Sequence, residues 1–283
     1  MAYRPRMTPL ETALAGRGRA AVARALAVVV EPVDGPGVRV ALDADRSFHA
    51  ASTMKVPVLV ELERRAAAGE LGLDDALVVR NEFRSIADGS SYALDPADDS
   101  ETSLYGREGA AVPLLELARL AIAVSSNLAT NLLVDLLGPA RITATMAALG
   151  APSLVVRRGV EDDPAWRAGL NNEVTARGLA TLLLGIARGD VVSSDASAQM
   201  LDILAAQAFD EGIPAGLPAG TRVAHKTGSI ADLYHDAGVV YPVDGASYAL
   251  VVLTRGLDEH AAGPALVADI TRAVHAAWSG GSG

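Results

Sequence analysis

The order of the predicted elements is what most constrains the fold of this chain. Short β-rich runs lie near both ends, and the long segment between them is predicted to be mainly helical. Hairpin-like connections between neighbouring runs favour antiparallel pairing, so the terminal strands are predicted to form one mainly antiparallel sheet. The predicted strands cover residues 26–30, 38–42, 222–227, 237–241 and 247–254, and terminal helices are expected at 8–24 and 258–277.

The middle of the chain is predicted to be an all-helical insertion. Its helices are expected at 53–69, 113–124, 127–137, 139–149, 174–188 and 194–208. The fold class is therefore α/β (α+β), with helices flanking the sheet. We predict an α/β subdomain made of residues 1–52 and 210–283, and an all-α subdomain of residues 53–209. A groove between a sheet edge and a helical subdomain is a common place for an active site.

Two stretches in the helical middle lack any regular periodicity. Residues 81–111 are rich in Asp, Ser and Gly and are predicted to be one long loop, and residues 151–172 are also irregular. Long loops inside compact domains are usually functional. Both segments are therefore expected to lie near the site.

Composition and charge exclude several classes of function. The 283 residues include no Cys, which excludes a disulfide scaffold, a cysteine-ligated zinc site and a thiol nucleophile. With 24 Lys+Arg against 34 Asp+Glu, the chain is acidic, so no nucleic-acid partner is expected. The longest stretches without charged residues are too short to cross a membrane, so no insertion is expected. The histidines show no metal-ligand spacing, and neither a metal nor a cofactor is predicted; oligomeric state is left open.

The N-terminal residues are basic, but no apolar segment follows them. A secretory signal needs such a segment. The sequence as written therefore predicts a cytoplasmic protein, or a periplasmic or secreted one if a signal has been removed.

A serine and a lysine, Ser52 and Lys55, open the helix predicted over 53–69. Residues three apart on a helix share one face. A serine hydroxyl is a weak nucleophile that needs a base beside it, and a lysine can serve when burial and nearby cations lower its pKa. The pair fits a nucleophile with its base, at a helix start whose N–H groups would stabilise an oxyanion. A capping serine followed by a solvated lysine is the plainer interpretation.

Two further polar groups interrupt apolar surroundings. Ser125 and Asn127 lie between two predicted apolar helices, where they fit either a helix cap or a proton-relaying hydroxyl beside an amide-binding side chain. Lys226 lies in a β-rich run and precedes residues 227–229. Gly228 in that segment would let a substrate backbone approach the strand closely. An edge-strand lysine with a turn glycine explains the same residues.

The three motifs occur together in an order and placement that resemble penicillin-recognising serine hydrolases. The chain is similar over roughly residues 20–277 to class A β-lactamases, and to the broader group of β-lactamase-like serine hydrolases around them. Two longer stretches support the resemblance. Residues 121–133 resemble the helix junction of that family, and residues 224–230 resemble its substrate-flanking strand.

The resemblance implies which residues transfer the acyl group. Ser52 is the implied nucleophile, Lys55 its base, and Ser125 the shuttle that carries a proton to the leaving nitrogen. The backbone N–H groups of Ser52 and Ser229 are the implied oxyanion hole. Ser126 stands where the family usually has Asp, which removes a charge that braces the junction.

The resemblance also implies which residues bind the substrate. Lys226 and Thr227 would hold the substrate carboxylate, and Lys226 would set the local electrostatics. Asn127 would contact the side-chain amide. Tyr105, in the long loop, would flank the cleft, although an ordinary half-buried tyrosine explains it equally well.

The predicted Ω-like loop, residues 157–172, departs from the family pattern. Class A members deacylate with a glutamate in an Arg-x-Glu pattern that is followed four residues later by Asn. Here Glu161 follows Arg158 by three, and Ala165 stands four residues beyond it. Glu161 is the candidate deacylation base, with Asn171 or Asn172 assisting. A structural ion pair with Arg158 is the alternative.

Three functions are compatible with these motifs. The first is a serine hydrolase of class A type that acts on β-lactams, as small-molecule substrates, through an acyl-enzyme. The second is an esterase, amidase or transacylase on a small intracellular substrate, which the altered loop and the missing export signal favour. The third is a penicillin-binding or sensor protein that deacylates slowly or stays blocked.

Overall fold

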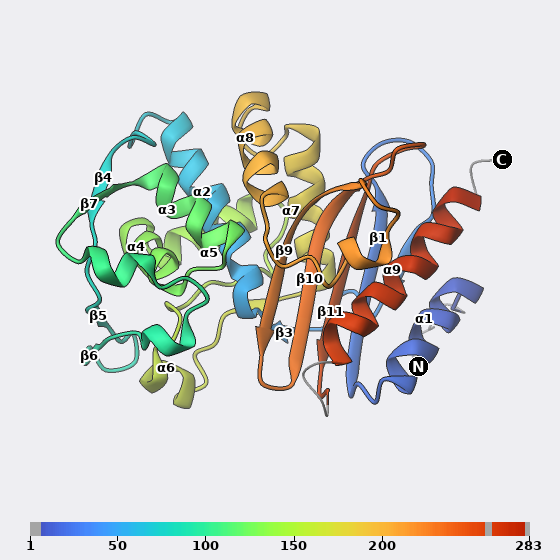
Figure 1. The fold of residues 1–283 in the computed structure, drawn as a ribbon, viewed down its shortest axis with the longest axis horizontal. Helices are drawn as coiled ribbons and strands as arrows, with labels where there is room; N and C mark the ends of the chain where they lie inside the picture. Colours follow the sequence, from blue (N-terminus) through green and yellow to red (C-terminus); the bar gives the residue numbers. More distant parts are fainter. Residues whose placement is uncertain (1–6, 258–261, 281–283) are drawn as a thin grey trace.

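The computed structural model describes residues 7–257 and 262–280. Its main sheet has five strands in the order β2-β1-β11-β10-β9, and every neighbouring pair is antiparallel. The strands are β1 (Ala25–Pro32), β2 (Val40–Leu42), β9 (Arg222–Ile230), β10 (Leu233–Tyr241) and β11 (Tyr248–Arg255). The predicted antiparallel sheet, built from both ends of the chain, is therefore confirmed. β9 lies at one edge and faces the helical part of the molecule (Figure 1).

Both faces of this sheet are buried, as the side chains of β1 demonstrate. Leu26, Val28 and Val30 pack in one core with the terminal helices, α1 (Pro9–Ala20) and α9 (Ala262–Gly280). The alternating Ala27 and Val29 pack in the other core with the helical middle. Strand side chains alternate between faces, so an unbroken apolar strand is buried on both sides. The molecule is thus layered, with terminal helices, sheet and helical middle in that order (Figure 1).

The helical middle confirms the predicted helices with small shifts at their ends. They are α2 (Lys55–Ala67), α3 (Leu114–Ala123), α4 (Asn127–Leu137), α5 (Pro139–Ala148), α7 (Ala176–Arg188) and α8 (Ser194–Ala205). α7 packs across β1, β10 and β11. Among the described residues, no helix is both long and apolar enough to cross a membrane.

Two terminal predictions need correction. The first helix ends at Ala20 rather than at 24, because Val22 has a φ of 58°, which no α-helix accommodates. The last helix begins at Ala262 and continues to Gly280, and residues 258–261 of its predicted span lie outside the described residues. The proposed subdomain boundaries stay a prediction.

The two irregular stretches contain more structure than predicted. Within 81–111 the chain forms a small hairpin, β5 (Phe83–Arg84) with β6 (Ser91–Tyr92), and two 3-10 turns, Pro96–Asp98 and Ser103–Arg107. The ends of this segment are joined by β4 (Ala76–Val78) and β7 (Ala111–Pro113). The second stretch contains α6 (Asp163–Arg167) and ends at β8 (Glu173–Val174), which pairs with β3 (Phe48–His49). Elements of two to five residues leave little periodic signal.

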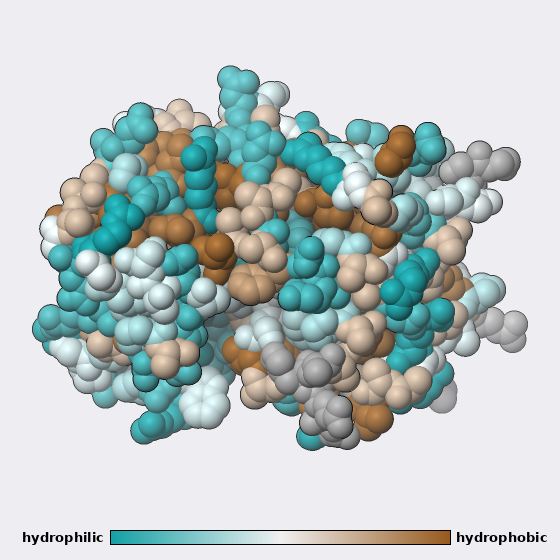
Figure 2. Space-filling model, in the orientation of Figure 1, coloured by the Kyte–Doolittle hydropathy of each residue, from teal (hydrophilic) through white to brown (hydrophobic). Residues whose placement is uncertain are grey.

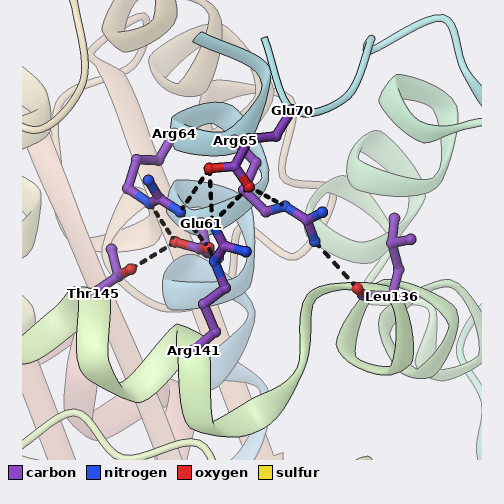
Figure 3. Close-up of polar contacts among 7 residues, drawn as sticks. All are labelled: Glu61, Arg64, Arg65, Glu70, Leu136, Arg141 and Thr145. Carbon is purple, nitrogen blue, oxygen red and sulfur yellow. Dashed lines mark hydrogen bonds and ion pairs between the residues drawn. The ribbon is translucent and has the colours of Figure 1, made fainter. Parts of the chain in front are cut away.

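A buried carboxylate fixes α2 to α5. Glu61 is fully buried, and its oxygens accept hydrogen bonds from Arg64 at 2.7 and 2.9 Å and from Thr145 at 2.7 Å. Arg141 approaches the same carboxylate at 3.2 Å and also binds Glu70 (Figure 3). A buried charge with this many partners is stable where an unpaired one would not be. The network holds the helix that carries Lys55.

Candidate active site

A cavity of about 830 Å³ lies between the edge of the sheet and the helical middle. The surface in Figure 2 is hollowed between these two parts, and hydrophobic residues are scattered over this face among hydrophilic ones. The cavity walls include the turn before α2, the α3–α4 junction, strand β9, the loop 157–172 and part of the long loop 81–111. Of the predicted site residues, those that line it are Ser52, Ser125, Asn127, Glu161, Thr227 and Ser229.

Ser52 lies in a 3-10 turn, Ala51–Met54, and α2 proper begins only at Lys55. The helix predicted from about residue 53 thus begins two residues later, and Ser52 lies in the 3-10 turn that leads directly into it. Side chains three residues apart in a 3-10 turn are nearly eclipsed, so Ser52 and Lys55 still project from one side. The turn is strained, because Ala51 has a φ of 45°, and the ring of His49 holds it by accepting a hydrogen bond from the Ala51 N–H at 3.0 Å.

Lys55 is almost fully buried at 1% exposure, and its ammonium has three acceptors. Nζ donates to the backbone oxygen of Ser125 at 2.6 Å, to Oγ of Ser125 at 3.1 Å and to Oδ1 of Asn127 at 3.0 Å. Burial lowers the pKa of Lys55 to about 7, against the opposing negative charges of Asp99 and Glu161. A lysine with that pKa is half deprotonated at neutral pH and can act as a base.

The α3–α4 junction presents Ser125 and Asn127 to Lys55. Ser125 has a φ of 57°, in the left-handed region, and Ser126 caps α4 by accepting from the Ala129 N–H at 3.2 Å. Asp99, from the long loop, accepts from the N–H groups of Asn127 and Leu128 at 2.9 and 3.0 Å. The junction is therefore held by a serine and by a distant carboxylate.

Strand β9 approaches the turn that carries Ser52 very closely. A Cβ added to Gly228 would lie 3.1 Å from the backbone nitrogens of Ser52 and Thr53. The glycine therefore makes room for this turn. That it also lets a substrate backbone approach the strand stays a prediction. Thr227 and Ser229, on either side of Gly228, line the cavity.

Lys226 is fully buried and is not among the residues that line the cavity, although its neighbour Thr227 is. Burial lowers its pKa well below the ordinary value, the positive charge of Lys55 lowers it further, and Asp236 opposes both effects. With the Gln207 amide oriented as its neighbours require, its oxygen accepts from Lys226 Nζ at 3.1 Å and its nitrogen donates to the Ala123 carbonyl at 3.1 Å. Gln207 thus links strand β9, which carries Lys226, to the end of α3.

In the loop 157–172, the residue two positions after Arg158 is Val160, which lines the cavity. Asn131 on α4 clamps its backbone: Oδ1 accepts from the Val160 N–H at 2.6 Å and Nδ2 donates to the Val160 carbonyl at 3.0 Å. Glu161 also lines the cavity, with its carboxylate accepting from the Asp95 N–H at 3.0 Å and from Asn127 Nδ2 at 3.2 Å. Burial raises the pKa of Glu161, and these two hydrogen bonds oppose the rise.

Other side chains of this loop serve the loop itself. The Arg158 guanidinium donates to the carbonyls of Leu170 and Gly159 and to Oδ1 of Asn171. It is not bonded to Glu161, so the alternative ion pair is not formed. Asn172 accepts from the N–H groups of residues 157 and 158, and its Nδ2 donates to the carbonyl of Arg158. Asn172 Nδ2 also donates to Sδ of Met54 at 2.8 Å, and Asn172 lines the cavity. Neither asparagine is hydrogen-bonded to Glu161, and their assistance to it stays a prediction.

Tyr105 is not among the residues that line the cavity. Its ring is partly buried against the core, and its hydroxyl donates to Asp99 at 2.9 Å. The expectation that Tyr105 flanks the cleft is corrected: the residues of the long loop that line the cavity are Asp98 and Ser100.

Three contributors to the site were missed from the sequence: Asp99, Gln207 and Asn131. Each acts on backbone or side-chain atoms far from it in the chain. The one available signal was Ser126, since a junction that lacks its usual carboxylate needs another acceptor for the first N–H groups of α4.

A buried lysine with a lowered pKa lies 3.1 Å from the hydroxyl of Ser125 and follows Ser52 of the strained turn by three residues, an arrangement that fits a serine hydrolase with a lysine base. A model of the Beta-lactamase enzyme family matches residues 10–278. Beta-lactamase FAR-1 of Nocardia farcinica is 30% identical over 250 residues, covering 84% of this chain and 74% of that protein. Beta-lactamase AST-1 of Nocardia asteroides is 31% identical over 245 residues, covering 85% and 75%.

Solved structures agree with this match. The structure of PBP-A superposes with a TM-score of 0.83 at 27% identity and covers 99% of both chains. A β-lactamase from Sphaerobacter thermophilus gives a TM-score of 0.79 at 27% identity, covering 95% of this chain and 97% of that one. The chain belongs to the β-lactamase enzyme family and has the class A β-lactamase fold.

Proposed function

We propose that this protein opens β-lactams through an acyl-enzyme on Ser52 and hydrolyses that acyl-enzyme. The observation that carries the proposal is the buried Lys55 ammonium, whose pKa is about 7 and which lies 3.1 Å from Ser125 Oγ at the cavity wall. A neutral lysine in that position can take the proton of one serine and, once protonated, return a proton to the other.

Acylation has two stages, attack on the lactam carbonyl and opening of the ring. Oγ of Ser52 attacks the lactam carbonyl carbon while neutral Lys55 takes its proton, and the carbonyl becomes an oxyanion facing backbone N–H groups. The C–N bond of the ring then breaks as Ser125 gives its proton to the nitrogen and recovers one from Lys55. No charge is left on the lysine at the end, so it is ready for the second half-reaction.

A second candidate, a penicillin-binding protein that deacylates slowly, is favoured by one observation in the loop 157–172. Val160 stands where the family pattern places the deacylating glutamate, and Glu161 already accepts two hydrogen bonds from Asp95 and Asn127. The likeness to the structure of PBP-A supports the same interpretation. Deacylation needs a base that contacts water. Glu161 would have to break at least one of its two hydrogen bonds before its carboxylate could act as that base.

A time course of intact mass with benzylpenicillin distinguishes the candidates. An adduct that appears and decays while product accumulates supports hydrolysis. An adduct that persists supports the penicillin-binding protein. If no adduct and no product form, the β-lactam assignment is wrong and the esterase, amidase or transacylase interpretation takes its place.

A further inference from the structure

We propose that Asp99 is a positioning residue for acylation: its carboxylate holds the Ser125–Asn127 junction in place, and its charge acts on Lys55. The inference rests on the proposed function, in which Lys55 is the base. Asp99 comes from the long loop, 28 residues before Asn127, and does not itself line the cavity.

The contacts of Asp99 form a complete cradle for a carboxylate. The side chain is buried at 8% exposure. Oδ1 and Oδ2 each accept from the Asn127 N–H at 2.9 Å, and Oδ2 also accepts from the Leu128 N–H at 3.0 Å and from the Tyr105 hydroxyl at 2.9 Å. Within its own loop, Oδ1 also accepts from the Glu101 N–H at 3.2 Å.

These bonds serve the first turn of α4. The first N–H groups of a helix have no partner within the helix, and the helix dipole favours a negative charge there. Ser126 takes one of these groups, at Ala129, and Asp99 takes those of Asn127 and Leu128. Asp99 therefore supplies from another loop the charge that Ser126 lacks.

The junction it holds is strained and functional. Ser125 has a φ of 57°, which a non-glycine residue keeps only when its surroundings enforce it. This conformation aims both oxygens of Ser125 at Lys55, while Asn127 adds a third acceptor. Loosening the helix start would displace all three acceptors together.

The charge of Asp99 also reaches Lys55. The charged groups that act on Lys55 and its surroundings are Asp99 and Glu161, both negative, and Lys226, which is positive. The negative charges raise the pKa of Lys55 against the larger lowering by burial. Removing the charge of Asp99 therefore moves the pKa of Lys55 downward.

The experiment measures the rate of acylation by a fluorescent penicillin as a function of pH, together with thermal unfolding. The variants are Asp99→Asn, which removes the charge, and Asp99→Glu, which keeps the charge but displaces it. The control is Asp135→Asn, which removes a carboxylate on α4 that pairs with Arg80 on the surface.

We expect Asp99→Asn to slow acylation roughly tenfold or more, and to move the acidic midpoint of the rate profile down by roughly one pH unit. Asp99→Glu should slow acylation with the midpoint near that of the wild type, and Asp135→Asn should change neither. If the acidic midpoint of the acylation profile in Asp99→Asn equals that of the wild type, the proposal is overturned, even if the acylation rate falls. If Asp99→Asn does not fold, a wild-type rate in Asp99→Glu overturns it.

The same experiment separates this inference from the proposed function. Wild-type protein that takes no label at any pH contradicts the proposed function. The unfolding temperatures still test the positioning role: both Asp99 variants should unfold at lower temperature than Asp135→Asn. Equal temperatures for all three would contradict the role of Asp99 at the helix start.

Discussion

Nζ of Lys55 lies 3.1 Å from Oγ of Ser125, although 70 residues separate them in the sequence. The contact forms because α2 and the α3–α4 junction meet at the cavity, and it excludes water from the lysine. The ammonium therefore loses hydration and keeps only acceptors from the protein. Burial of this kind lowers a lysine's pKa toward neutrality.

This contact predicts how acylation depends on pH. Below its pKa of about 7 Lys55 is protonated and cannot accept the proton of Ser52, so the acylation rate should fall as pH drops through about 7. Lys55→Arg should lose roughly a hundredfold or more at every pH, because arginine stays protonated. Stopped-flow acylation from pH 5 to 9 measures both. A rate that is flat across pH 7 would show that Lys55 is not the base.

The position of Val160 in the loop 157–172 indicates that a glutamate there would speed deacylation. Val160→Glu would place a carboxylate at the cavity wall on a backbone that Asn131 already holds. We expect the acyl-enzyme to decay roughly a hundredfold faster than in the matched variant Val160→Gln, which has the same shape but no base. Single-turnover mass spectrometry measures the decay. Equal decay in the two variants would mean that this position does not activate water.

The bridge through Gln207 predicts a loss of both binding and stability. Gln207→Leu removes the acceptor of the Lys226 ammonium and the donor to Ala123. Unpaired buried polar groups cost about 1–3 kcal/mol each, so unfolding should be easier by an amount in that range. The KM for acylation should rise, because the Thr227 N–H also loses the Gln207 oxygen as its hydrogen-bond acceptor. Gln199→Leu on α8 is the control, and denaturant titration with steady-state kinetics reads both effects. A variant that behaves like the control would refute the bridge.

The buried carboxyl group of Glu63 should make the stability of the fold depend on pH, independently of catalysis. It is 2% exposed, its Oε1 has no hydrogen-bond partner, and burial raises its pKa to about 7. The folded state therefore holds a proton that the unfolded state releases above its ordinary pKa of 4.5, and stability is lost as pH rises through about 7.

Glu63→Gln tests this linkage. The variant should match the wild type near pH 4 and be more stable at pH 8 by up to about 3 kcal/mol, the free energy of the shift. Urea titrations at the two pH values give the difference. A variant that is less stable than the wild type at pH 8 would contradict the unpaired carboxylate.

The antiparallel sheet and the main helices could be predicted well from the sequence alone, because their signals are local. Apolar runs marked the strands, and glycines such as Gly138 and Gly150 marked helix ends. The motif residues Ser52, Lys55 and Ser125 were found for the same reason, since each lies at a predicted element boundary.

What could not be predicted depends on contacts between distant segments. The loop 81–111 has no period, so neither its short strands nor the carboxylate of Asp99 could be placed on the α3–α4 junction. Tyr105 was expected to flank the cleft for the same reason. Its hydroxyl instead donates a hydrogen bond to Asp99, whose position could not be predicted. The sequence predicted that another backbone comes close to Gly228. That the turn at Ser52 is such a neighbour could not be predicted, because the contact depends on how β9 packs.

The central claim is that Ser52 is the nucleophile activated by the Lys55–Ser125 pair. Covalent labelling by a fluorescent penicillin tests it most directly, with wild type and Ser52→Ala compared at pH 8 after both are shown to be folded. We predict a labelled wild-type band and none for Ser52→Ala, with the modified peptide of the wild type containing Ser52. Labelling of Ser52→Ala at the wild-type rate would contradict the account.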